Sequence, residues 1–592
     1  MMSLCVDTLA AGARTRRARE MSIGAERSPR PRVWWTYAAL LCMGALFLVL
    51  AVTSLTGKSV TVDEFGHLPT GLNLIGHGEM RYAHLNPPLA RLLSALPLAA
   101  AGVPPIATDA LAFQQRYDFW ANGYAFMQRE ADTYHAHFVR ARWVSVCLAL
   151  LLGALAFFWT RRLAPAHAGW GGLLAAGLIW FDPNLLAHAR LVTTDLALTL
   201  FLLLALFALE RFLRRPAWTT ALACGITLGL AQLVKFSAVY LYVTHLVLIL
   251  IWVGRAPGRR RRLLGLGLVA LVVSVFVLDA GYAFQRVGRM VSEISFRSDA
   301  LRGLAALLPP RLMLPLPEDF LRAFDLQLLD AQTGDPSYLL GRSYVGGRWD
   351  YFPVLLLSKT PLPLLLLFGL AVGIRLRALR GRRPPDHARY DLILLLPAGL
   401  LLAVFGLLSE KQLGLRMILP CVALIWIWVA ATWASFPLRR GATLLLIACC
   451  LWLGIETSAV HPHYLPYYNP LAGGPERGHL VAVDSNCDWG QDLPALARYM
   501  DEEGIESVQL LYFGRVDPVI YGIEYDVPRR AGRPGHLAVS RTLYGRGYVL
   551  PDHGRLVQGG PYPFDSDPPG VRVASLGHSI DVYRIGDAAP GK

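Results

Sequence analysis

The stretch that decides the fold runs from residue 34 to 68 and reads "WWTYAALLCMGALFLVLAVTSLTGKSVTVDEFGHL". Its first part, 34–55, is an apolar run long enough to cross a bilayer as a helix, which takes about 20 residues. Two adjacent carboxylates, Asp63 and Glu64, follow shortly after this run. Charge at this position either marks the edge of the membrane or takes part in chemistry. The pattern of polar residues in the rest of the chain distinguishes these two interpretations.

The composition predicts a polytopic α-helical membrane protein. Of the 592 residues, 54% are hydrophobic and only 17% are charged, which is too apolar for a soluble protein of this size. Apolar runs that could span a bilayer recur along the chain and predict about eleven transmembrane helices. They cover residues 34–55, 141–160, 169–187, 191–212, 217–234, 236–253, 263–282, 352–374, 391–408, 416–434 and 441–458.

The distribution of basic residues sets the predicted topology. The net charge is +15, but most arginines lie in short clusters between the apolar runs, which is typical of the positive-inside rule and excludes nucleic acid as the partner. If every predicted helix crosses, all of these clusters fall on the same side of the membrane. We therefore expect an inner (plasma) membrane protein with a cytoplasmic N-terminus and an external C-terminus. The clusters precede residue 34 and recur at 161–162, 214–215, 259–262, 375–383 and 439–440.

Three regions follow from this topology. Residues 1–33 form a basic cytoplasmic segment, and residues 34–458 form the transmembrane domain with two long external loops, 56–140 and 283–351. Residues 459–592 form a polar external tail in which apolar stretches such as "HLVAVDSN", "SVQLLYFG" and "VRVASLGHSIDVYRI" alternate with a helix near 491–503. This spacing predicts a small C-terminal α/β domain.

The eight cysteines indicate no metal or disulfide chemistry. Most of them lie inside apolar runs, where a thiol behaves as a small hydrophobic group. The chain contains no CxxC pair and no zinc-ligand spacing, so neither a disulfide framework nor a zinc site is expected.

Polar residues collect at the predicted external ends of the helices, where charge is costly and usually has a partner or a task. Each one also has a structural interpretation: Lys235 and Lys359 could snorkel to headgroups, and Asp195 could cap a helix or pair with Arg190. Together, carboxylates and cations on one face suit a reaction in which a carboxylate removes a proton and Lys or Arg stabilises a departing phosphate. The candidate residues are Asp63, Glu64, His84, Asn86, Arg190, Asp195, Lys235, Lys359 and Arg416.

Several of these stretches resemble one family. "TVDEFGHL" is similar to the Asp-Glu motif in the first external loop of the protein O-mannosyltransferase and aminoarabinose-transferase group, within the glycosyltransferase-C superfamily. "NPPLARLL" resembles the "HPPL" segment of that group, with Asn86 where relatives often have His. "ARLVTTDLALTLF", "LVKFSA", "WDYFPVLLLSKTPLPLL" and "YNPLAGGPERGHLVAVDSNCDWGQDL" resemble further stretches of its bacterial members.

The resemblance implies an inverting transfer of a sugar from a polyprenyl-phosphate donor to an envelope acceptor at the external membrane face. By this resemblance, Asp63 is the general base, Glu64 is its neighbour, and Asp195 lines the acceptor or sugar pocket. Lys235 faces the donor phosphate, with Arg416 as a second phosphate candidate. A divalent metal occurs in some members of the superfamily, but no ligand spacing in this sequence demands one.

Two alternatives to a transferase remain open. A transporter or flippase for lipid-linked sugars would place its key polar groups near the membrane midplane, whereas here they gather at helix ends. An inactive relative could instead serve as a scaffold. The tail motif "DSNCDWGQDL" also has two interpretations. Trp489 could stack on a sugar while Asp484 and Asp488 bind hydroxyls, or the segment is a turn rich in Asp, Ser and Asn, which we favour.

Overall fold

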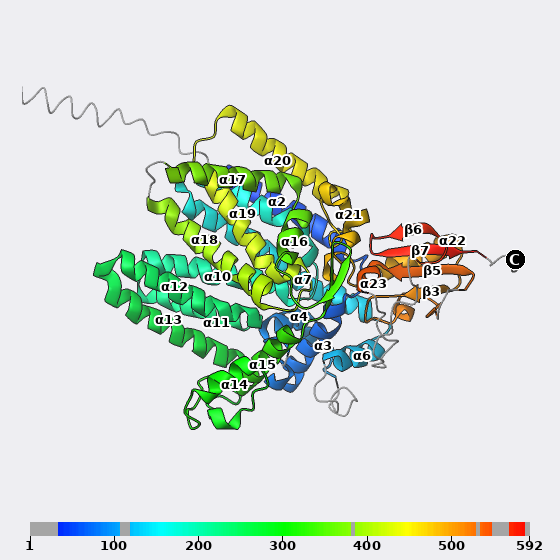
Figure 1. The fold of residues 1–592 in the computed structure, drawn as a ribbon, viewed down its shortest axis with the longest axis horizontal. Helices are drawn as coiled ribbons and strands as arrows, with labels where there is room; N and C mark the ends of the chain where they lie inside the picture. Colours follow the sequence, from blue (N-terminus) through cyan, green and yellow to red (C-terminus); the bar gives the residue numbers. More distant parts are fainter. Residues whose placement is uncertain are drawn as a thin grey trace, which may run out of the picture.

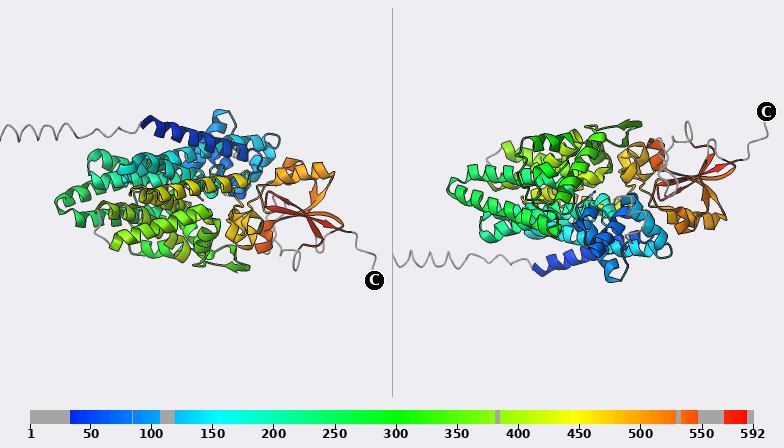
Figure 2. Two further views of the ribbon diagram at one scale, coloured as in Figure 1. Left: turned by 90° about the horizontal axis from the view of Figure 1, so that it is seen from above. Right: turned by 90° about the horizontal axis from the view of Figure 1, so that it is seen from below.

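The computed structural model describes residues 33–83, 85–106, 119–380, 385–528, 533–546 and 568–586. It is a bundle of long helices with a small β-sheet at one end, and the described chain enters the bundle near the opposite end (Figures 1 and 2). The predicted fold class, a polytopic helical membrane protein with a small C-terminal α/β domain, is confirmed.

In the described part of the chain, eight helices are long and apolar enough to cross a membrane, or nine if one bent pair counts as a span. The bent pair is α16 (Tyr351–Lys359) and α17 (Leu362–Arg380). The other long helices are α2 (Val33–Leu55), α7 (Tyr134–Leu163), α10 (Thr194–Arg214), α12 (Tyr240–Arg255), α13 (Arg260–Gly281), α18 (Pro385–Ala403), α19 (Leu419–Trp433) and α20 (Arg440–Ala459).

Three of the predicted spans are shorter or broken, so the estimate of about eleven continuous spans is too high. The helix α8 (Ala168–Trp180) stops where Asp182, which accepts a hydrogen bond from the Asn184 amide, caps the short α9 (Pro183–His188). The helix α11 (Trp218–Gln232) ends before the turn that carries Lys235. Between α16 and α17 the chain bends by 113°, because Pro361 keeps the preceding residue extended.

Small residues allow the close contact between α11 and α13. Gly225 and Gly229 lie four residues apart on α11, a small-xxx-small pattern that lets two helix backbones approach. A Cβ atom at Gly225 would lie 2.5 Å from the carbonyl oxygen of Ala270, and one at Gly229 would lie 2.6 Å from that of Ser274. Only glycine fits at either position, and α11 is thereby fixed against its neighbour.

The basic clusters at 161–162, 214–215 and 259–262 lie together at one end of the bundle, which we call the basic end. At the end of α7, Arg162 lies 3.8 Å from the Glu210 carboxylate near the end of α10. Arg259, just before α13, donates to the Arg214 carbonyl at 3.2 Å. These contacts place the C-terminal ends of α7, α10 and α12 together at the basic end. The chain must therefore return toward the opposite end after α7 and again after α10. The short helices α8 and α11 lie on these two return paths. The end that carries the β-sheet is remote from these contacts (Figure 1), and we call it the site end.

Shorter elements of the two long loops cover the site end. In α3 (Val62–His77) the sequence Thr-Val-Asp-Glu forms a capping box, in which the Glu64 carboxylate accepts the Thr61 backbone N–H at 3.0 Å. The remaining elements are α4 (Leu89–Ala100), α6 (Phe119–Arg129), α14 (Asp299–Ala306), α15 (Glu318–Thr333), β1 (Pro336–Leu339) and β2 (Arg342–Val345).

In the described part of the tail, the sheet has five strands in the order β4-β3-β5-β7-β6. Strand β3 pairs in parallel with β4 and β5, whereas β7 is antiparallel to both β5 and β6, so the sheet is mixed. The expected strand at "HLVAVDSN" is wrong: this segment forms short 3₁₀ turns, because its polar residues are buried against the helical bundle. The elements are α21 (Gly474–Arg477), α22 (Leu493–Glu503), β3 (Val508–Leu511), β4 (Tyr525–Asp526), β5 (Gly535–Ser540), α23 (Arg541–Arg546), β6 (Val571–Leu576) and β7 (Ile580–Ile585).

Candidate functional site

Four charged residues from distant parts of the sequence meet at the site end. Asp63 lies in the first turn of α3, and Asp195 lies in the first turn of α10. Lys235 occupies the turn after α11, and Arg416 lies in the turn that leads into α19. We call these four residues the charged cluster.

The four side chains alternate in charge. Lys235 Nζ lies 2.6 Å from Asp195 Oδ1, and Arg416 Nη1 lies 3.5 Å from Asp195 Oδ2. The same Arg416 nitrogen lies 2.6 Å from Asp63 Oδ2. The order is therefore Lys235, Asp195, Arg416, Asp63, in which two cations are balanced by two carboxylates.

The members of the cluster differ in exposure. The Asp195 side chain is 1% exposed and that of Arg416 is 9% exposed, so these two form its buried centre. Lys235 and Asp63 are more open, at 19% and 24%. One carboxylate and one cation therefore remain accessible to a substrate, whereas Asp195 is enclosed by its partners.

Glu64, directly next to Asp63, has a different environment. The Arg142 guanidinium forms a bidentate pair with it, with Nε–Oε1 and Nη2–Oε2 distances of 2.8 and 2.7 Å. The backbone amides of Thr61 and Val192 donate to the same carboxylate. Burial alone would raise the pKa of Glu64, but the Arg142 charge and these hydrogen bonds outweigh it and hold the pKa below its ordinary value.

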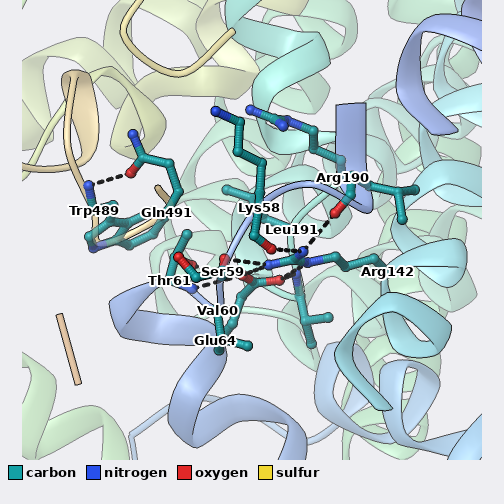
Figure 3. A network of polar contacts seen from close by, with 12 residues as sticks. Lys58, Ser59, Val60, Thr61, Glu64, Arg142, Arg190, Leu191, Trp489 and Gln491 are labelled. Atoms are coloured by element: carbon teal, nitrogen blue, oxygen red, sulfur yellow. Dashed lines mark hydrogen bonds and ion pairs between the residues drawn. The ribbon is translucent and has the colours of Figure 1, made fainter. Parts of the chain in front are cut away.

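Arg142 connects this carboxylate to the chain that enters α3. Its Nη1 donates to the carbonyls of Leu55 and Lys58, and its Nη2 donates to that of Ser59 (Figure 3). Both residues of the pair are fully buried. Glu64 and Arg142 therefore fix the backbone that presents Asp63, and no lone pair of Glu64 faces solvent.

The other predicted site residues lie apart from the cluster or have structural partners. Lys359 Nζ donates to three carbonyls, those of Leu465, Tyr467 and Asn486. Arg190 donates to the Ser54 carbonyl at 2.5 Å. Asn86 precedes α4, and its carbonyl accepts a hydrogen bond from Arg91 at 3.3 Å. His84 lies outside the described residues.

Three features near the cluster were not predicted from the sequence. Arg142 is one, although an arginine at the start of an apolar run was a usable signal. A second is the pair in which Arg91 Nε donates to His67 Nδ1 at 3.1 Å. Burial and the nearby Arg91 charge lower the pKa of His67 well below its ordinary value, so the imidazole accepts this bond in its neutral form. The third is the contact of Trp489 with Arg416, whose Cζ lies 4.2 Å from the ring centroid.

Metal ligation has no support in the described part of the chain. There, no group of three or more His, Cys, Asp or Glu side chains is placed so that it could hold a metal ion. The charged cluster itself supplies carboxylate and cationic groups.

Residues 99–287 match the family model described as dolichyl-phosphate-mannose-protein mannosyltransferase. The chain is similar to the glycosyltransferases of this family. The match confirms the resemblance predicted from the motifs, and with it the prediction of a membrane glycosyltransferase. The matched stretch contains Asp195 and Lys235, whereas Asp63 and Arg416 lie outside it.

The solved structures that are similar in overall fold include the following three, whereas no curated protein matches the sequence. ArnT from Cupriavidus metallidurans bound to undecaprenyl phosphate has 12% identity and a TM-score of 0.45, covering 92% of this chain and 97% of that one. The S. cerevisiae Pmt1-Pmt2 complex bound to the sugar donor has 12% identity and a TM-score of 0.46, covering 72% and 88%.

The third is the oligosaccharyltransferase AglB from Archaeoglobus fulgidus, in complex with an inhibitory peptide and a dolichol-phosphate. It has 12% identity and a TM-score of 0.44, covering 86% of this chain and 69% of that one. Likenesses at this level carry no argument about individual residues.

Proposed function

We propose that the protein transfers a sugar from a polyprenyl-phosphate donor to an envelope acceptor, with inversion at the anomeric carbon. The observation that carries this proposal is the charged cluster at the site end, where the partly open Asp63 pairs with Arg416 and the buried Asp195 pairs with both Arg416 and Lys235. The match over residues 99–287 supports it, because the description of that family names dolichyl-phosphate-mannose, a lipid-phosphate sugar.

The cations suit the leaving group of such a transfer. A polyprenyl-phosphate sugar is a phosphodiester with one negative charge. When the bond between the sugar and the phosphate breaks, the polyprenyl phosphate that leaves is a monoester with a second negative charge. Lys235 and Arg416 supply fixed positive charge where this extra charge develops, which stabilises the transition state more than the ground state. Asp195, buried between them, keeps both cations in place when no donor is bound.

Asp63 is the proposed general base. An acceptor hydroxyl or amine is a poor nucleophile until a carboxylate within hydrogen-bond reach takes its proton. In the transfer, the acceptor atom forms a bond to the anomeric carbon on the face opposite the phosphate. The bond from that carbon to the phosphate oxygen breaks, polyprenyl phosphate leaves with the electron pair, and Asp63 takes the acceptor proton.

The pairing of Asp63 with Arg416 links donor binding to activation of the base. In the free protein the Arg416 guanidinium lies 2.6 Å from Asp63 Oδ2, so this carboxylate is engaged in an ion pair. A donor phosphate competes for the same guanidinium. Arg416 would then neutralise the phosphate and release Asp63 to accept the acceptor proton.

The proposed orientation places the site end outside the cytoplasm. By the positive-inside rule the basic end is cytoplasmic, which puts the C-terminal domain on the external face of the inner membrane. A polyprenyl donor would approach from the surrounding bilayer. The acceptor is a protein, a glycolipid or a polysaccharide of the envelope, and the sugar is a hexose or a pentose.

A transferase is favoured over a transporter of lipid-linked sugars because the cluster lies at helix ends and not within the spans. The direct test is incubation of the purified protein with a polyprenyl-phosphate sugar and an envelope extract. Transfer releases free polyprenyl phosphate in proportion to the glycosylated product. Mass spectrometry of envelope glycans and glycoproteins from a deletion strain and its parent would identify the acceptor. Movement of donor across proteoliposomes without any product would favour the transporter instead.

A further inference from the structure

The tail motif "DSNCDWGQDL", residues 484–493, carries buried polar side chains that the proposed chemistry does not use. Asp484, Ser485, Asn486, Asp488, Gln491 and Asp492 are all buried, as is Trp489. The segment belongs to the C-terminal region in sequence, yet it packs beneath the charged cluster. Its contacts reach Arg416 and the segment that presents Asp63.

The first set of contacts fixes the turn that carries Arg416. The Trp489 ring lies under the guanidinium, with its centroid 4.2 Å from Cζ. Ser485 Oγ accepts a hydrogen bond from Arg416 Nε at 3.2 Å. One residue earlier, the Leu415 backbone amide donates to Asn486 Oδ1 at 3.0 Å. The face and one edge of the guanidinium are thus held by the motif, while Nη1 extends to the carboxylates.

The second set of contacts fixes the segment that presents Asp63. The Val62 backbone amide donates to the Trp489 carbonyl at 3.1 Å, and the Ser59 amide donates to the Gln491 carbonyl at 2.9 Å. Ser59 Oγ also donates to the Gly490 carbonyl at 2.7 Å. Figure 3 shows Trp489 and Gln491 beside the chain from Lys58 to Thr61, on the side away from Arg142. Two independent sets of contacts therefore meet in Trp489.

Two further polar side chains of the motif, Gln491 and Asp488, bond to backbone groups. Gln491 Oε1 accepts the Trp489 amide at 2.7 Å, and Gln491 Nε2 donates to the Cys487 carbonyl at 3.0 Å. Asp488 accepts the amides of Gly490 and Thr542. The Trp489 ring contacts Arg416, and the Asp488 carboxylate accepts backbone amides. These contacts favour the interpretation of the motif as a turn over its interpretation as a sugar-binding site.

We propose that Trp489 and Ser485 are positioning residues that hold Arg416 where it exchanges Asp63 for the donor phosphate. The inference rests on the proposed function and deepens it, because it makes the C-terminal segment 484–493 part of the phosphate site. A cation that lies over an aromatic face is attracted by the ring quadrupole. This attraction restricts the orientation of the Arg416 guanidinium plane. The Nη groups of Arg416 then keep the geometry that two competing anions require.

Three variants separate aromatic support from simple packing. Trp489→Leu removes the ring and should weaken binding of undecaprenyl phosphate about ten- to thirtyfold, the cost of a desolvated cation–π contact. Trp489→Phe keeps an aromatic face and should retain most of the affinity. Trp433→Leu is the matched control, because Trp433 is equally buried near the end of α19, remote from the cluster, and bonds to the Leu367 carbonyl. Equal losses in Trp489→Phe and Trp489→Leu would overturn the proposal.

A double-mutant cycle tests whether Trp489 acts through Arg416. In an Arg416→Ala background the ring has no guanidinium to hold, so adding Trp489→Leu should change affinity less than about twofold. Full additivity of the two losses would contradict the positioning role.

A structure of Trp489→Leu determined by cryo-electron microscopy gives a readout independent of the donor. The proposal expects Arg416 to leave its contact with Asp63, and an unchanged contact would overturn it. If the wild-type protein bound no undecaprenyl phosphate, the proposed function would fail while this structural readout would still decide the role of Trp489.

Discussion

Asp63 and Glu64 are neighbours with opposite environments. Glu64 faces the interior, where Arg142 and two backbone amides bond to its oxygens, whereas Asp63 is partly open and pairs with Arg416. Adjacent positions in the first turn of a helix point in different directions, so a single Asp-Glu dipeptide supplies both a fixed anchor and an accessible carboxylate. The sequence predicts the pair, but the division of roles depends on Arg142, which lies far along the chain.

Glu64→Gln should reduce stability more than chemistry. Removing one partner of a buried ion pair leaves an uncompensated charge and costs about 3–5 kcal/mol. We expect a clear fall in Tm, measured in detergent, while turnover per folded molecule falls less than in Asp63→Asn. Glu502→Gln on the exposed face of α22 is the control and should leave Tm unchanged. An unaltered Tm in Glu64→Gln would contradict the anchoring role.

The same substitution should change the acid limb of stability. Because the folded-state pKa of Glu64 lies below its ordinary value, its contribution is fully present above that ordinary value. It is lost as the pH falls toward the folded-state pKa. The wild-type protein should therefore lose Tm on acidification more steeply than Glu64→Gln.

Lys235 is the more exposed of the two cations in the cluster, and its proposed role in binding the donor phosphate can be tested by substitution. Lys235→Ala should weaken undecaprenyl-phosphate binding about thirtyfold or more, as expected when one partner of a partly buried charge pair is truncated. Lys235→Arg should keep part of the affinity, because the charge remains but the compact ammonium does not. Normal affinity and turnover in the alanine variant would mean that Lys235 only anchors the turn at the headgroups.

At the scale of elements, hydropathy predicts where helices lie but not how far each extends. The apolar content of 169–187 and 217–234 matches that of a span, yet Asp182 and the Lys235 turn end those helices early. The second interruption places Lys235 in the charged cluster. The position of the tail motif 484–493 could not be predicted for a different reason. Its turn-forming residues do not indicate that they pack against a segment more than 400 residues earlier in the chain.

The packing of α11 against α13 should be intolerant of even one methyl group. Gly229→Ala would place Cβ 2.6 Å from the Ser274 carbonyl oxygen, and overpacking of this kind costs about 1–3 kcal/mol. We expect a lower Tm and weaker donor binding, because α11 leads directly to Lys235. Gly254→Ala on α12 is the matched control, since no atom lies within 4 Å of a Cβ there. Equal Tm values for the two variants would contradict the close contact of the helices.

At the scale of the whole molecule, the separation of the basic end from the site end predicts the orientation in the membrane. In a background without native cysteines, an impermeant maleimide applied to intact cells or spheroplasts should label Val519→Cys in the tail. It should not label Arg261→Cys in the basic cluster until the membrane is permeabilised. Both positions are exposed. Labelling of Arg261→Cys alone would invert the topology and place the site end in the cytoplasm.

Removal of the proposed base tests the transfer most directly. Asp63→Asn keeps the shape of the side chain but cannot take a proton, and loss of a general base typically lowers the rate by about 10²–10⁴-fold. Turnover of a polyprenyl-phosphate sugar by the purified variant should fall by that order. Donor binding should persist or strengthen, because Arg416 no longer pairs with a carboxylate at this position. Near-normal turnover in Asp63→Asn would contradict acid–base catalysis by this residue and leave the Asp-Glu pair as a marker of the membrane edge.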